Sequence, residues 1–139
     1  MSGTDHRLGP LHFGATHAEA YLGLERVAEA ARMNDEHLAL AREAGSRYFE
    51  ALALRVQGQI RAAQGLPDEA EAAFTTAIAI LEPSGARLEL GRALYHRARL
   101  RQSLGRNDDA RADLTRARDL FAACSAPRDL RHAETLLAT

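Results

Sequence analysis

The sequence has no lysine, because all 18 basic residues of this 139-residue chain are arginines. A Schiff base needs a lysine amine and a Walker-type phosphate loop needs its lysine, so both kinds of site are excluded. Tryptophan is also absent, and the single cysteine, Cys124, excludes an intrachain disulfide and a cysteine-rich zinc site. No apolar run is long enough to span a bilayer, and residues 1–15 lack the apolar core of a signal peptide. We therefore expect a cytoplasmic protein with no membrane segment.

Helix-forming residues make up most of what is present. Hydrophobic residues are 46% of the chain and charged residues 27%, which is enough apolar surface for a buried core. Alanine, leucine, glutamate and arginine dominate, whereas the aromatic residues that strands prefer are only 5%. The length fits one domain. The composition therefore predicts a single all-α domain.

Charge is unevenly distributed along the chain. Residues 1–85 carry 7 arginines and 12 acids, a net charge of −5, whereas residues 86–139 carry 11 arginines and 7 acids, a net charge of +4. One interpretation is an unevenly solvated surface, and the other is an arginine-rich contact surface towards the C-terminal end. The exclusive use of arginine is also typical of a GC-rich bacterial genome.

A long internal repeat organises the chain. The interval of about 40 residues between Gly45 and Gly85 recurs between Gly85 and Ser125 and between Gly65 and Gly105. Each interval predicts a helix, a glycine turn, a second helix and a further turn. We expect a flexible lead-in over residues 1–15 and one domain over residues 16–139. The predicted parts of the domain are a degenerate first repeat (16–44), two full repeats (45–84 and 85–124) and a capping helix (125–139).

Local signals refine the helix boundaries. Thr16 and Glu19 form a capping-box pattern, which predicts that the first helix begins at Thr16. Asn34-Asp35 predicts a break within residues 16–44, with one uninterrupted helix as the alternative. Asn107 is the expected N-cap of a later helix. Pro67, followed by Asp68 and Glu69, suits the first turn of another helix, and Asp108-Asp109 suits a first turn in the same way.

Small and large apolar residues recur at matching places in the two full repeats. These matched pairs are Gly58 and Ala98, Ala70 and Ala110, Phe74 and Leu114, and Ala77 and Ala117. This pattern resembles the tetratricopeptide repeat family, in which small residues let two antiparallel helices approach closely. The segment 94–106 is most similar to the longer-repeat subtype, with a period of about 40 residues, found in large bacterial signalling ATPases and maltose-regulator-like transcription activators. The chain departs from the family pattern in having Gln57 and Arg97 in place of leucine, and Arg61 and Arg101 in place of tyrosine.

The resemblance implies an antiparallel α-solenoid of about three helix pairs that binds another protein in a concave groove. The first helix of each pair lines that groove. The positions that correspond to groove contacts are Arg55, Gln59 and Ala62 in one unit and Arg92, Tyr95, Arg99 and Gln102 in the next. This wall of arginines and amides suits an acidic or carboxylate-bearing segment of a partner. The resemblance thus implies an adaptor in bacterial signalling or transcription regulation.

The residues predict no chemistry of the chain's own. No two of the six histidines have the spacing that places two metal ligands on one helix face, and no nucleophile motif is present. We therefore expect no enzyme, no catalytic residue, no metal and no cofactor. Among the histidines, His96 is expected to be a surface or partly packed residue. The arginines of residues 92–118 are interleaved with acids, so we expect intrahelical pairs such as Asp113 with Arg116 rather than a nucleic-acid surface.

Two other functions remain open at this point. A homo-oligomeric structural domain would follow if the closing helix, with Leu130, Leu136 and Leu137, left an apolar end exposed. A nucleic-acid-associated fragment of a regulator is the third reading. The sequence is compatible with a whole protein and with the end of a longer regulator.

Overall fold

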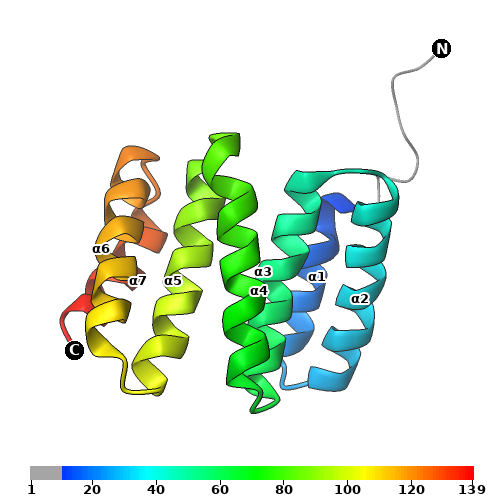
Figure 1. Ribbon diagram of the computed structural model, residues 1–139, viewed down its shortest axis with the longest axis horizontal. Coiled ribbons are helices and arrows are strands. Elements are labelled where there is room, and N and C mark those ends of the chain that lie inside the picture. The colour runs from blue at the N-terminus through cyan, green and yellow to red at the C-terminus, as the bar shows by residue number, and fades with distance from the viewer. Residues whose placement is uncertain (1–10) are drawn as a thin grey trace.

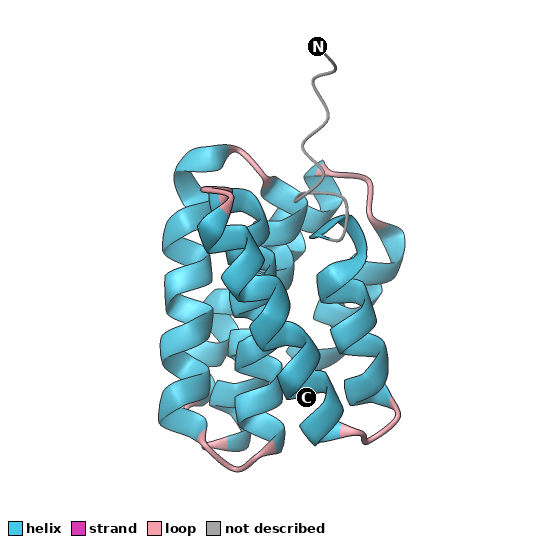
Figure 2. Ribbon diagram, turned by 90° about the vertical axis from the view of Figure 1, so that its right-hand side faces the viewer, coloured by secondary structure: helices cyan, strands magenta, loops and turns pink. Residues whose placement is uncertain are grey.

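The computed structural model describes residues 11–139, with side chains from residue 14 onward, so most of the predicted lead-in lies outside the described residues. This range contains seven α-helices, one 3₁₀ turn and no strand (Figure 1, Figure 2). The all-α prediction is therefore confirmed for these residues. No helix among them is both long and apolar enough to cross a membrane. The elements are α1 (Leu11–Gly23), α2 (Val27–Glu43), α3 (Arg47–Ala63), α4 (Pro67–Leu81), η1 (Glu82–Ser84), α5 (Arg87–Ser103), α6 (Asn107–Ala123) and α7 (Pro127–Leu137).

A residue with positive φ recurs at a regular interval and separates each helix from the next. The φ values are 71° at Gly45, 75° at Gly65 and 76° at both Gly85 and Gly105. The series extends to two residues that are not glycine, Glu25 at 61° and Ser125 at 53°. Because only glycine adopts this region at little cost, the four glycines mark the turns in the sequence, and Glu25 and Ser125 complete the same series.

Five of these six turns close with the same hydrogen bonds. After α2, the Gly45 amide donates to the Arg42 carbonyl at 3.1 Å and the Ser46 amide donates to the Ala41 carbonyl at 2.9 Å. The second bond spans five residues, which is the pattern of a Schellman turn. Equivalent pairs of bonds follow α1, α3, α5 and α6. At Gly85 the turn is instead reached through η1, where Pro83 cannot continue α4.

The predicted boundaries in the first repeat are wrong in two places. The break lies at residues 24–26 rather than at Asn34-Asp35, because Glu25 takes the turn position that Gly65 holds in the next unit. Asn34 lies inside α2 and is 1% exposed. Its side-chain amide donates to the Ala53 carbonyl of α3 at 2.9 Å. Asn34 thus connects two helices instead of starting one.

The start of the first helix is also earlier than predicted. α1 begins at Leu11, so Thr16 and Glu19 lie within it and form no capping box at its start. Gly14 is not part of a lead-in either. It lies in α1 against α2, and a Cβ atom there would come within 2.6 Å of His37 Cγ. The absence of a side chain at Gly14 is what allows the two helices to approach.

The predicted starts of two later helices have different outcomes. Pro67 is the first residue of α4 and is followed by Asp68 and Glu69 in the first turn, as predicted. Asn107 is the first residue of α6 rather than its N-cap. Arg106 precedes it, and no side chain caps the helix. Asp108 and Asp109 lie in that first turn, where their charge favours the helix dipole.

The core forms where the matched small and large residues meet. Ala70, Ala77, Ala98, Ala110 and Ala117 are fully buried, as are the larger side chains of Phe74 and Leu114. Gly58 of α3 lies directly against the Phe74 ring of α4, where an added Cβ would approach Cε1 to 2.4 Å. The prediction that these positions pack closely is confirmed. The α3–α4 and α5–α6 pairs are each built around them.

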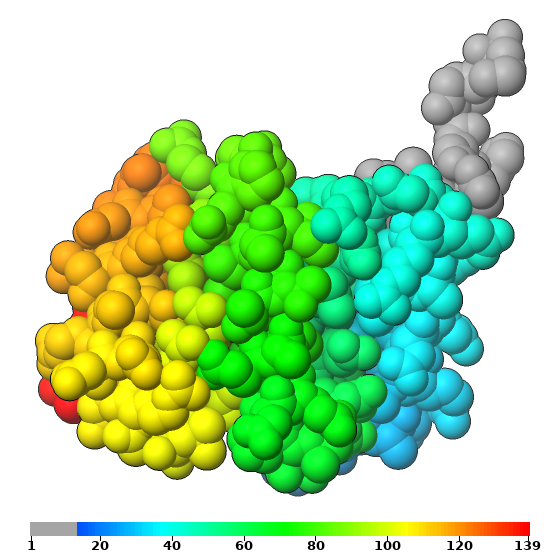
Figure 3. Space-filling view, in the orientation of Figure 1, coloured from blue at the N-terminus to red at the C-terminus, as the bar shows by residue number. Residues whose placement is uncertain are grey.

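The helices form two faces. The even-numbered helices α2, α4 and α6 lie towards the viewer in Figure 3, in cyan, green and yellow to orange. The odd-numbered helices also contact one another in sequence, α1 with α3, α3 with α5 and α5 with α7. We call the surface formed by these four helices the odd face. Leu130 of α7 packs on the main core, and Leu136 and Leu137 pack on the cluster formed by α5 and α6.

Some arginines of α5 and α6 pair locally, as Arg92 does with Glu89, but Arg97, Arg101 and Arg116 pair with acids of other elements. Asp113 is buried and accepts hydrogen bonds from Arg97 at 2.8 and 2.9 Å and from Arg101 at 3.2 Å. Arg116 pairs with Glu82 instead. The expected Asp113–Arg116 pair is therefore wrong. Arg97 and Arg101, which depart from the repeat pattern, are accommodated because Asp113 pairs with both and Glu71 of α4 also pairs with Arg101.

Candidate binding site

The seven predicted contact residues lie on α3 and α5, on the odd face. Arg55, Gln59 and Ala62 belong to α3, and Arg92, Tyr95, Arg99 and Gln102 belong to α5. Most of them are engaged with other parts of the chain through ion pairs or hydrogen bonds. Whether they also contact a partner stays a prediction.

Alternating charges cross the odd face from α1 to α7. Arg55 is only 5% exposed and lies 2.9 Å from the carboxylate of Glu19 and 3.8 Å from that of Glu89. Glu89 also pairs with Arg92 at 3.1 Å, and Arg92 reaches Asp129 of α7 with two hydrogen bonds of 3.2 Å. We call this series the charge ladder. It joins all four odd-numbered helices and neutralises Arg55 and Arg92, which the sequence predicted as groove cations.

The two predicted amides are engaged as well. Gln59 accepts a hydrogen bond from Arg55 at 2.8 Å and donates one to Glu19 at 3.1 Å. Gln102 donates to the Leu136 carbonyl near the end of α7 at 3.2 Å. Amides that are already bonded within the chain are costly to redirect towards a partner.

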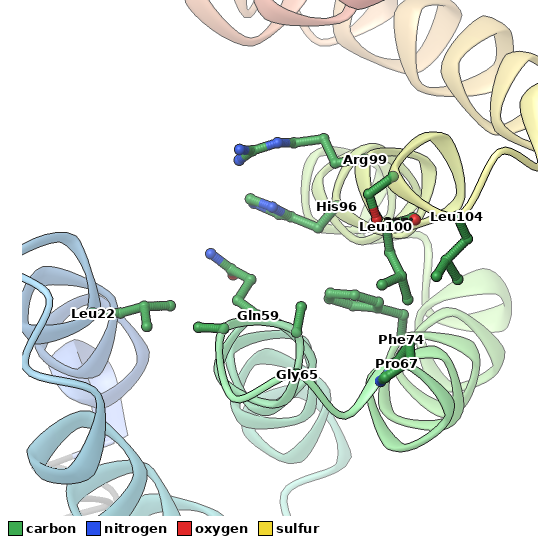
Figure 4. Close-up of a pocket in the computed structure, with 12 residues that line it drawn as sticks. Leu22, Gln59, Gly65, Pro67, Phe74, His96, Arg99, Leu100 and Leu104 are labelled. Carbon is green, nitrogen blue, oxygen red and sulfur yellow. Dashed lines mark hydrogen bonds between the residues drawn. The ribbon is translucent and has the colours of Figure 1, made fainter.

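A pocket of about 570 Å³ opens on the odd face between α1, α3 and α5 (Figure 4). Phe74 and Leu100 form its apolar floor, and Leu22 faces across from α1. Gln59, His96 and Arg99 supply its polar wall. Of the seven predicted residues, Gln59, Ala62 and Arg99 line it. The complete lining is Leu22, Gln59, Ala62, Ala63, Gly65, Pro67, Phe74, His96, Arg99, Leu100, Ser103 and Leu104.

Arg99 differs from Arg55 and Arg92, the other two arginines predicted as groove contacts. It is exposed, and within residues 11–139 it has neither an ion pair nor a side-chain hydrogen bond. Figure 4 shows its side chain beside that of His96, both directed into the open space of the pocket. Among the described residues, no acid lines this space. Arg99 therefore gives the pocket wall an uncompensated positive charge.

His96 is held against the floor by aromatic contacts. Its ring lies nearly parallel to that of Phe74, with the centroids 6.4 Å apart and the planes 13° apart, and its edge meets Tyr95. Burial lowers the pKa of His96 well below its usual value, and the positive charges of Arg55, Arg99 and Arg92, together with His132, lower it further. The ring is therefore neutral at pH 7, and each ring nitrogen serves either as donor or as acceptor.

Exposed leucines mark the turns beside the pocket. Leu24, Leu66 and Leu104 are 67%, 41% and 46% exposed. They follow α1, α3 and α5, whose C-terminal ends lie at the same end of the molecule (Figure 1). Leu104 itself lines the pocket. Leu104 thus extends the apolar lining of the pocket to this end of the molecule, and we call these three leucines the leucine edge.

Sequence reasoning missed the role of several pocket residues. His96 is partly buried, as the sequence predicted, but its place in a pocket wall was not foreseen, and Phe74 was expected only to fill the core. For Phe74 the sequence did contain an indication. Phe74 occupies the position that Leu114 has in the next unit, and its larger ring extends to the pocket floor. For Leu22 there was no signal, because the boundaries of α1 were misplaced.

Nowhere in the described part of the chain do three or more histidine, cysteine, aspartate or glutamate side chains gather in a way that could hold a metal ion. Comparison with known proteins gives no family model that matches the chain and no matching curated protein.

Proposed function

We propose that this chain is a tetratricopeptide-like interaction module that binds an acidic segment of another protein on its odd face. The observation that carries the proposal is Arg99, an exposed arginine without an ion-pair partner among the described residues, beside an apolar pocket. The matched small residues of the repeats and the stacked odd-numbered helices support the solenoid reading. The bacterial regulatory setting rests on the family resemblance, and the proposal assigns the chain no catalytic step.

The contact surface we propose is narrower than the arginine wall that the resemblance implied. Arg55 and Arg92 belong to the charge ladder, so a partner would have to break existing ion pairs to use them. Arg99 and the leucine edge need no such exchange. A partner segment with an acidic residue next to large apolar residues therefore matches this end of the odd face.

The test is a selection from a displayed peptide library on the immobilised chain, repeated with Arg99→Glu. We expect peptides enriched in acidic and large apolar residues, and we expect their binding to fall at least about tenfold in Arg99→Glu, because a charge pair becomes a repulsion. Arg87→Glu is the matched control, since Arg87 is an exposed arginine on the same helix, about 18 Å away along the axis. Selected peptides that bind wild type and Arg99→Glu equally would rule out this surface.

A further inference from the structure

The pocket on the odd face has the shape of a small-molecule site. Its volume of about 570 Å³ lies within the range of roughly 300–1,000 Å³ that is usual for such sites. Helices α1, α3, α4 and α5 line it, and the Phe74 ring of α4 and Leu100 of α5 form its floor (Figure 4). Nothing among the lining residues needs to move to create the space. The pocket is thus concave and already formed, as ligand sites generally are.

The chemistry of the lining specifies the kind of ligand. Seven of the 12 lining residues are alanine, leucine, phenylalanine or proline, whereas the single charged group is Arg99. One guanidinium in an apolar setting matches one carboxylate, which it can hold through two parallel hydrogen bonds. A sugar or a polyphosphate would need more polar or cationic groups than the wall supplies. The lining therefore favours a monoanion with an apolar body.

We propose that this pocket binds a small organic monocarboxylate, with the carboxylate on Arg99 and the apolar body over Phe74 and Leu100. Flat aromatic acids fit best, because the partly exposed His96 ring lies nearly parallel to the buried Phe74 ring and gives the wall a flat aromatic surface. This site goes beyond the proposed partner binding and does not depend on it. The two would meet at Arg99, so a bound carboxylate would compete with an acidic partner segment for that side chain.

A peptide is the less suitable occupant of the pocket itself. A bound peptide carries a backbone amide at nearly every residue, and each buried amide needs a hydrogen-bonding partner. Gln59, the amide side chain of the lining, is already bonded to Arg55 and Glu19. A compact carboxylate makes its polar contacts at one end only, where Arg99 lies.

The experiment uses 2-naphthoate as the probe, titrated into the full chain by calorimetry and by two-dimensional NMR. We expect saturable binding with shifts at the amides around the pocket. The neutral analogue 2-naphthamide should bind roughly 10–100-fold more weakly, because it lacks the charge-assisted contact to Arg99. Arg99→Gln should weaken 2-naphthoate binding by a similar factor and leave binding of 2-naphthamide unchanged.

Two variants separate the pocket from the rest of the surface. Ala62→Phe places a ring in the pocket from an exposed position of α3 and should abolish binding of both probes with the helix content preserved. Arg87→Gln removes an exposed arginine elsewhere on α5 and should bind like wild type. Absence of 2-naphthoate binding at millimolar concentration, or equal binding by Arg99→Gln, would overturn the proposal. Either result leaves the peptide selection unaffected, so the two hypotheses can fail separately.

Discussion

Replacement of Gly58 by alanine tests how closely α3 and α4 pack. The new Cβ would lie 2.4, 2.6 and 2.7 Å from three atoms of the Phe74 ring, where carbon atoms normally stay about 3.5 Å apart or more. The ring is 1% exposed, so a shift that relieves the contact also disturbs its packed neighbours. Overpacking of this kind costs up to about 3 kcal/mol, and the higher helix propensity of alanine returns about 1 kcal/mol. We therefore expect Gly58→Ala to lower the free energy of unfolding by about 2 kcal/mol.

The chain contains its own control for this substitution. At the matching positions of the next unit, Ala98 and Leu114 are both buried, so alanine is accepted where the facing side chain is leucine. Gly58→Ala combined with Phe74→Leu should recreate that pair. The double variant should then be more stable than the sum of the two single effects by up to about 3 kcal/mol, because the clash disappears while the gain in helix propensity is kept.

Urea denaturation followed by circular dichroism in the far ultraviolet measures all four members of this cycle. If Gly58→Ala were as stable as the wild type, or if the two substitutions were simply additive, the inferred contact between Gly58 and Phe74 would be wrong. An unchanged slope with denaturant is expected in every variant, since none alters the surface buried by the fold as a whole.

Two further predictions concern the turns and two histidines. Glu25→Gly and Ser125→Gly should each stabilise the chain by roughly 0.5–1 kcal/mol, because glycine relieves the positive φ at these positions but loses more entropy on folding. Thermal unfolding measures both effects, and Gly65→Ala should show the opposite sign. For the histidines, burial first and then nearby charge lower the pKa of His96, and burial and His17 lower that of His37. Below about pH 6.5 the unfolded chain therefore binds more protons than the folded chain. The free energy of unfolding should then fall as the pH is lowered from about 7.5 to about 5.5. His96→Gln should reduce this fall. An identical pH profile in His96→Gln would refute this.

The fold was predictable where glycine had to supply an unusual backbone conformation. The four glycines with positive φ are evenly spaced, and the helices between them follow from composition. Prediction failed where another residue takes that conformation. Glu25 is not a residue typical of turns, so the sequence did not indicate the turn there. Asn34 is typical of a helix start, but its side-chain amide instead bonds to α3 from within α2.

The candidate site was predictable only in part, because a sequence position does not reveal which charges pair in space. Arg55, Arg92 and Arg99 look alike in the sequence, yet only Arg99 lacks an ion-pair partner within the described residues. The difference comes from Glu19 and Asp129, which are 36 and 37 residues away from the arginines that they pair with. Such separations are invisible to spacing rules that operate within one helix.

The turns restrict how many helices this chain can gain or lose without disturbing its faces. The same backbone conformation returns at every turn, but a helix returns to the same face only at every second turn. Loss or duplication of a single helix with its turn would preserve every turn but move each later helix to the opposite face. Depending on the helix, this would separate Arg92 from Asp129 or Arg55 from Glu19. Changes by a complete helix pair keep both the turns and the faces. A lineage that gains or loses units should therefore do so by whole helix pairs, and the charge ladder supplies the selection against odd steps.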